Sequence, residues 1–81
     1  MAAEDPDVAQ ARVFLAALTE ETVAVAAVLD DARRLSAEAR ARGNNALALW
    51  HEQQAKAHKR TLRELSRQSE NLRSRFPLTA E

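Results

Sequence analysis

Two histidines are the residues whose type and spacing come nearest to metal chemistry in this sequence. His51 and His58 lie seven residues apart, so on a helix they share a face but are separated by about 10.5 Å along its axis. A single metal ion prefers ligands four residues apart, on adjacent turns. We therefore expect two partly buried histidines at the edge of a helix interface and no metal or cofactor, although symmetry could bring copies of the pair together.

Carboxylates offer no better case for catalysis. None of the four glutamates between residues 32 and 75 is followed three residues later by histidine, which is the pattern that di-iron helical bundles use. The adjacent acids Glu20–Glu21 and Asp30–Asp31 would point about 100° apart on a helix, so neither pair converges on one substrate atom. A single glycine excludes a glycine-rich phosphate loop. We predict that the chain is not an enzyme.

A basic stripe is the strongest binding signal. Its four cations, at steps of four, three and four residues, share one helix face: Lys56, Arg60, Arg63 and Arg67. Clustered cations on an accessible face could bind an anionic partner such as nucleic acid. The alternative is a solvated face with local ion pairs such as Glu52–Lys56 and Arg60–Glu64. Zero net charge, the absence of interleaved aromatic residues and the nearby glutamates favour the solvated face.

The elements that would position these residues are helices. The 81 residues include 46% hydrophobic and 30% charged residues, one glycine, two prolines and no cysteine. Good helix formers dominate the chain, and its size allows one small domain. The sequence predicts an all-α fold, a coiled-coil-like antiparallel hairpin with helices at about 6–42 and 46–75 and a turn at 43–45, as a single domain over 1–81.

The first helix has clear boundaries and a continuous heptad seam. Asp5 and Pro6 are typical of a helix start, and Gly43 of a left-handed helix terminator. Steps of three and four residues connect the seam positions Val8, Ala11, Leu15, Leu18, Thr22, Val25, Leu29, Ala32, Ser36 and Ala39. This regular alternation indicates packing against a second helix.

The second helix has a thinner seam. Asn45 is the expected N-cap and Pro77 the stop signal. The seam positions are His51, Ala55, His58, Leu62, Leu65, Ser69, Leu72 and Phe76. Trp50, near the turn, is expected to close that end of the core against Leu35 and Ala39. A turn of two or three residues makes the helices antiparallel neighbours.

The first helix is apolar over a wider face than one neighbour can cover. If its seam residues are labelled a and d, the g positions beside the seam are Phe14, Glu21, Val28 and Leu35. An exposed apolar strip of this length promotes association. We therefore expect two hairpins to form a four-helix bundle, with an oligomer interface comprising Phe14, Leu18, Glu21, Val25, Val28 and Leu35. The alternative is association of this strip with an unrelated helix.

Glu21 interrupts this strip and is expected at the dimer face. Such a charge costs stability unless it is paired, here with Arg75 or Arg12, and it can fix the register of assembly.

Charge is distributed unevenly along the chain. Seven acids and one base occur up to Asp31, whereas eleven bases and four acids lie between Ala32 and Arg75. The acidic start lacks a secretory n-region, and the apolar runs are shorter than the roughly 18 residues of a membrane span. A cytoplasmic location without membrane association is expected.

These features favour a non-enzymatic homodimeric helical interaction module, meaning a small regulator, adaptor or assembly factor that binds itself and another protein. The alternative is a small nucleic-acid-binding regulator that uses the basic stripe.

Overall fold

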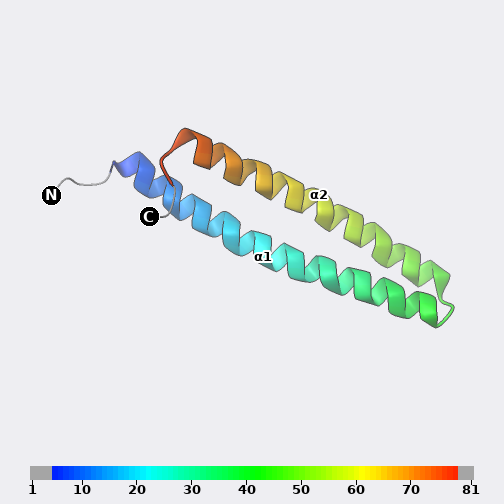
Figure 1. Cartoon of the computed structure of the whole chain (residues 1–81). Helices are drawn as coiled ribbons and strands as arrows, with labels where there is room; N and C mark the ends of the chain where they lie inside the picture. Colours follow the sequence, from blue (N-terminus) through cyan, green and yellow to red (C-terminus); the bar gives the residue numbers. More distant parts are fainter. Residues whose placement is uncertain (1–4, 79–81) are drawn as a thin grey trace.

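The computed structural model describes residues 5–78 and shows two long helices packed side by side. Helix α1 spans Pro6–Ala41 and helix α2 spans Asn45–Arg75. They run antiparallel, with the turn at one end of the molecule and both ends of the described chain at the other (Figure 1). The molecule measures 65 × 17 × 16 Å, so it is a long rod whose two short dimensions are nearly equal. The predicted all-α hairpin is confirmed.

The start of α1 follows from its first residues. The Asp5 side chain accepts a hydrogen bond of 2.8 Å from the backbone N–H of Asp7. Pro6 occupies the first turn, where its missing N–H leaves no hydrogen bond unmade. The helix therefore begins at the predicted residue.

The turn combines two helix caps in very few residues. Gly43 has φ of +78°, a left-handed conformation that glycine adopts without steric cost. The Gly43 N–H donates to the Arg40 carbonyl at 3.0 Å, and the Asn44 N–H donates to the Ala39 carbonyl at 2.9 Å. These two bonds form a Schellman motif, which satisfies carbonyls at the end of α1.

The cap of α2 is Asn44, and the expectation of Asn45 was wrong by one residue. The Asn44 side chain accepts from the Leu47 N–H at 3.1 Å, while Asn45 is already the first helical residue. Because Asn44 also donates to Ala39, one residue ends the first helix and begins the second. At the other end, Phe76 is extended before Pro77, as the restriction on residues preceding proline requires.

The seam between the helices is the predicted one. Every seam position predicted for either helix is buried or half-buried, and the exposed positions lie between them. The buried set is mostly small: Ala11, Leu18, Leu29, Ala32, Ser36, Ala39, Ala48, Leu65 and Ser69. No large side chain within residues 5–78 falls below 2% exposure. Two helices thus form a continuous contact but enclose little apolar volume.

Trp50 does not close the turn end of the core, contrary to expectation. Its side chain is 57% exposed. The closure is made by Ala39 and Ala48, which are both 0% exposed, and by the Ser36 hydroxyl, which donates to the Ala48 carbonyl at 3.2 Å. Trp50 directly precedes the seam residue His51, so its side chain points to the flank of the hairpin rather than between the helices.

Candidate interaction site

The two flanks of the seam differ in chemistry. In an antiparallel helix pair, the g positions of both helices border one side of the hairpin and the e positions border the other. Consistent with this, Phe14 of α1 lines a hollow with Gln68 and Arg75 of α2. All three are g positions when the α2 seam is labelled in the same way as the α1 seam, with Ala55 at a and His58 at d. We call this the apolar side. The opposite flank, which also exposes Val23 beside a hollow lined mainly by hydroxyl residues, we call the polar side.

The apolar side is exposed and hollowed at both ends. Near the chain ends, a hollow of about 230 Å³ lies beside Phe14, which is 59% exposed. Toward the turn, a second hollow of about 210 Å³ is lined by Val28, Leu35 and Trp50. Val28 is 47% exposed. Open hollows between apolar side chains can receive the side chains of a second helix.

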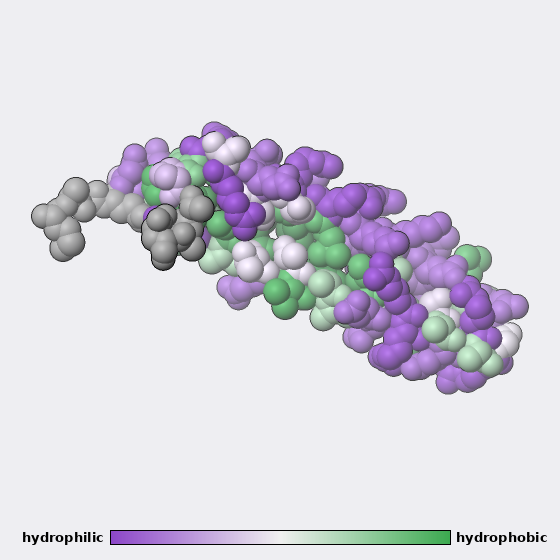
Figure 2. All heavy atoms as spheres, in the orientation of Figure 1, coloured by the Kyte–Doolittle hydropathy of each residue, from purple (hydrophilic) through white to green (hydrophobic). Residues whose placement is uncertain are grey.

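The apolar character comes mainly from α1. Between residues 13 and 28 the only charged residues are Glu20 and Glu21. On the face shown in Figure 2, hydrophobic atoms gather along the middle of α1, whereas α2 and the turn are mostly hydrophilic. One helix therefore supplies most of the apolar surface that its neighbour leaves uncovered.

The predicted interface residues divide into two groups. Phe14, Glu21 and Val28 are exposed, and Leu35 is half-buried beside the second hollow. Leu18 and Val25 belong to the seam, where Leu18 is only 8% exposed.

Two further residues on α2 were not predicted to belong to the apolar side. Trp50 is exposed there, and Leu47, one turn earlier at a g position, is 38% exposed. Their spacing from the α2 seam could have identified both.

Glu21 lies in the exposed strip of the apolar side. Within residues 5–78 it forms no ion pair, so the expected pairing with Arg75 is not made. The carboxylate is exposed and stays hydrated in the single hairpin. Any helix that covers the apolar side must accommodate it.

The two histidines lie beside the turn-end hollow. His51 and His58 are half-buried and line it together with Asp31. The Trp50 ring meets His51 edge-on, with ring centroids 5.1 Å apart and planes at 79°. Across residues 5–78 no group of three or more histidine, cysteine or acidic side chains is placed to hold a metal ion. The arrangement is an aromatic and imidazole rim around an apolar hollow.

The polar side carries a cross-helix ion pair. Arg40 of α1 donates to the Glu52 carboxylate of α2. This hydrogen bond is the main cause that lowers the pKa of Glu52, and Lys56 contributes only a weaker charge effect. The expected Glu52–Lys56 pair is therefore replaced by a contact that joins the two helices near the turn.

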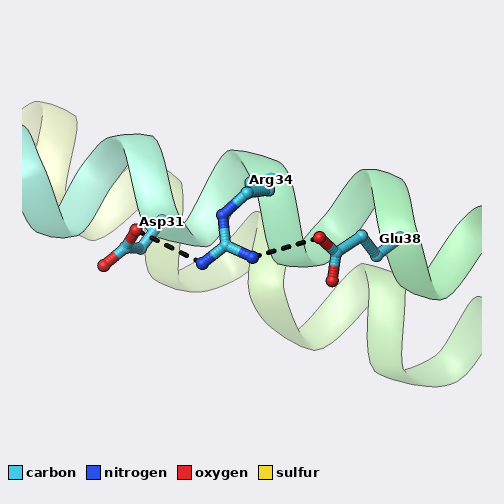
Figure 3. A network of polar contacts seen from close by, with 3 residues as sticks. All are labelled: Asp31, Arg34 and Glu38. Atoms are coloured by element: carbon cyan, nitrogen blue, oxygen red, sulfur yellow. Dashed lines mark hydrogen bonds and ion pairs between the residues drawn. The ribbon is translucent and has the colours of Figure 1, made fainter.

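A second charge cluster lies on α1 alone. Arg34 bonds to Glu38 at 3.0 Å and to Asp31 at 3.4 Å, bridging two turns of the helix (Figure 3). The bond to Glu38, followed by that to Asp31, raises the pKa of the Arg34 guanidinium. This cation is occupied locally, and so is Arg40, which reduces the positive charge available near the turn.

The basic stripe is exposed along α2. Arg60, Arg63 and Arg67 line a shallow hollow of about 540 Å³ together with Glu64. Glu64 binds Arg67 at 2.6 Å and Gln68 at 3.4 Å, so the expected pair with Arg60 is not formed. In the described part of the chain, no ion pair involves Arg60 or Arg63. These two guanidiniums remain open to an anionic partner.

Neither described helix has an apolar stretch long enough to cross a membrane. Comparison with protein-family models, with curated proteins and with solved structures found no match to this chain.

Proposed function

We propose that this protein is a non-enzymatic, homodimeric helical interaction module that acts in the cytoplasm as a small regulator, adaptor or assembly factor. Two hairpins pair through their apolar sides into a four-helix bundle, and the outer helix faces bind another protein. The observation that carries the proposal is the exposure of Phe14 (59%) and Val28 (47%) on one hollowed side of the hairpin.

The thin seam supports self-association. A domain of this size has a small core even when it is globular, and here the buried residues are mostly alanine and serine with a few leucines. Small scaffolds without disulfides or metals commonly gain the missing burial by oligomerisation. The chain has no cysteine, so a disulfide cannot supply the missing stability. A second copy would cover apolar surface that the hairpin alone exposes to water.

Sedimentation equilibrium at micromolar protein tests the proposal. The unmodified chain should have twice its monomer mass of 9.0 kDa. Val28→Glu should weaken the dimer by at least about tenfold in Kd, because it places a charge in an apolar contact. Val13→Glu is the matched control, since Val13 is 71% exposed and occupies an f position facing away from α2. A purely monomeric unmodified chain contradicts the proposed function.

A second candidate is nucleic-acid binding through the basic stripe, favoured by the unpaired state of Arg60 and Arg63 among the described residues. Fluorescence anisotropy with a random-sequence DNA duplex would detect it. Binding should weaken steeply with salt, because phosphate contacts release counterions. Arg60→Glu with Arg63→Glu should abolish it and leave the dimer mass unchanged. Binding that persists in the double variant would rule out the stripe.

A further inference from the structure

We infer that the second copy packs with its α1 antiparallel to α1 of the first, in the register that places Phe14 against Leu35 of the second copy. The inference rests on the proposed function and specifies its geometry. The partner is another copy of this chain, and the contact is centred on Ala24.

Matching of surface chemistry selects α1 as the partner of α1. On the apolar side, the g positions of α1 include Phe14, Val28 and Leu35, whereas the next three g positions of α2 after Leu47 are Gln54, Thr61 and Gln68. A two-fold axis perpendicular to the helices places α1 on α1 and α2 on α2. Apolar side chains then meet apolar ones, and amides meet amides. A two-fold axis parallel to the helices would instead place α1 against amide-rich α2.

Charge along α1 selects the antiparallel register. In the inferred register, residue numbers that face each other across the dimer add up to 49. Asp7 then faces Arg42 of the second copy, and both residues are exposed g positions. The pair occurs twice, once at each end of the interface. Opposite charges facing each other at the rim favour one register over others even where each pair adds little affinity.

The middle of the interface also agrees with this register. Phe14 faces Leu35 of the second copy, and Glu21 faces Val28, so the two Glu21 carboxylates do not meet. Each Glu21 still places a charge against an apolar side chain, a cost that this register carries at two symmetric points. The contact spans nearly the full length of α1, because the midpoint of Pro6–Ala41 lies beside Ala24. Alanine at this point allows the two helices to approach closely.

Moving the second copy by one heptad removes these matches. If the shift makes facing residue numbers add up to 42, Glu21 faces Glu21 of the second copy across the two-fold axis. Like charges in such a contact are destabilising. Arg42 then has no partner. If the shift makes facing residue numbers add up to 56, Phe14 faces Arg42 of the second copy, and Asp7 extends past the end of that copy's α1. Of these three registers, only the inferred one pairs Asp7 with Arg42 at both ends while keeping the two Glu21 carboxylates apart.

The same two-fold axis gives Trp50 a partner. Within one hairpin, Val28 and His58 line one hollow and Phe14 and Leu72 line another. An axis at Ala24 therefore brings the Trp50 end of one α2 to the Arg75 end of the other. Arg75 already lies 6.0 Å from the Phe76 ring centroid in its own chain. A guanidinium over an exposed indole is a favourable cation–π contact.

Disulfide trapping tests the register, and the absence of native cysteine makes each single variant unambiguous. Ala24→Cys should cross-link efficiently under mild oxidation, because the two copies of this position lie beside the axis, only about 1.5 Å apart along the helices. Glu21→Cys should cross-link at least about tenfold more slowly. In the inferred register its two copies are about 10.5 Å apart along the helices, beyond the Cα separation of about 4.4–6.8 Å that a disulfide spans. Ala27→Cys, on the outward face, measures collisional background.

The outcomes separate this inference from the proposed function. Faster cross-linking of Glu21→Cys than of Ala24→Cys would overturn the register in favour of the heptad-shifted one. A dimer of normal mass in which neither variant exceeds the Ala27→Cys background would overturn the pairing of α1 with α1. A monomeric mass for the unmodified chain overturns the proposed function itself. If Ala24→Cys cross-links fastest and the particle has the mass of a dimer, both the inferred register and the proposed function are supported.

Discussion

The two ends of the seam are built differently. At the turn, Ala39 and Ala48 are completely buried, and a hydroxyl from Ser36 and an ion pair between Arg40 and Glu52 join the helices. At the opposite end, larger side chains meet less completely. Leu72 is half-buried between hollows of about 230 Å³ and about 160 Å³, both of which Phe14 also lines.

The difference shows what two helices can and cannot bury by themselves. Small side chains let backbones approach until no solvent remains between them, so alanine is fully covered by a single neighbour. A leucine or phenylalanine extends past the contact line and needs a third surface to be covered. The seam is therefore closed at the turn by Ala39 and Ala48 within one chain, whereas at the open end Leu72 stays half-buried.

Enlarging a buried alanine at the turn should have the largest effect. Ala48→Leu forces a bulky side chain into a position with 0% exposure, and overpacking of this kind costs about 1–3 kcal/mol. Urea denaturation at fixed protein concentration, followed by circular dichroism, would measure the loss. Ala46→Leu, at an exposed position of the same helix, should change stability little. Equal losses in both variants would show that the turn end is not tightly packed.

Truncation at the open end should cost less. Leu72→Ala removes contacts from a half-buried side chain, so the expected loss of about 1 kcal/mol lies below the range for fully buried leucines. Leu49→Ala, at a residue 55% exposed, should be nearly neutral in the same urea titration. If Leu72→Ala proved as costly as Ala48→Leu, the two ends would be equally well packed.

The caps at the turn allow a sharper test with two adjacent asparagines. Asn44→Ala removes the side-chain acceptor of the Leu47 N–H and should destabilise the hairpin by about 1 kcal/mol. Asn45→Ala changes a helical residue to the best helix former and should leave stability unchanged or slightly increased. Thermal melting would distinguish them, and the reverse order would restore Asn45 as the cap.

The smallest expected effect is the pH dependence of the Arg40–Glu52 pair. Arg40 lowers the folded-state pKa of Glu52 below its ordinary value of 4.5. The stabilisation is therefore present above the ordinary pKa and is lost as pH falls through the lowered one. The melting temperature of Glu52→Gln should lie slightly below that of the unmodified chain at pH 7, and the gap should close as the pH is lowered past 4.5. Glu70→Gln, without a cross-helix partner in the described structure, should show no such convergence.

Periodicity and chain-breaking residues predicted the fold almost completely. The steps of three and four residues identified the seam, and Gly43 and Pro77 located the ends of the helices within one residue. The cap was missed because Asn44 and Asn45 are chemically identical. Only the geometry of the turn decides which side chain reaches the Leu47 N–H.

The residues of the candidate site were predicted less completely than the fold. Trp50 was expected inside the core from its hydrophobicity and its position near the turn. Trp50 directly precedes the seam residue His51, so its side chain lies on the flank of the hairpin, and this spacing in the sequence was overlooked. Glu64 had both Arg60 and Arg67 within reach on its own helix, and side-chain packing decided which one it binds.

Both ends of the described chain emerge at the same end of a rod 65 Å long (Figure 1). A polypeptide fused before Asp5 or after Leu78 would be attached at the end of the rod opposite the turn. In the inferred dimer the two-fold axis reverses the direction of the rod for the second copy. Cargo attached to each chain would then be held at opposite ends of the particle, so the assembly would act as a molecular spacer of fixed length.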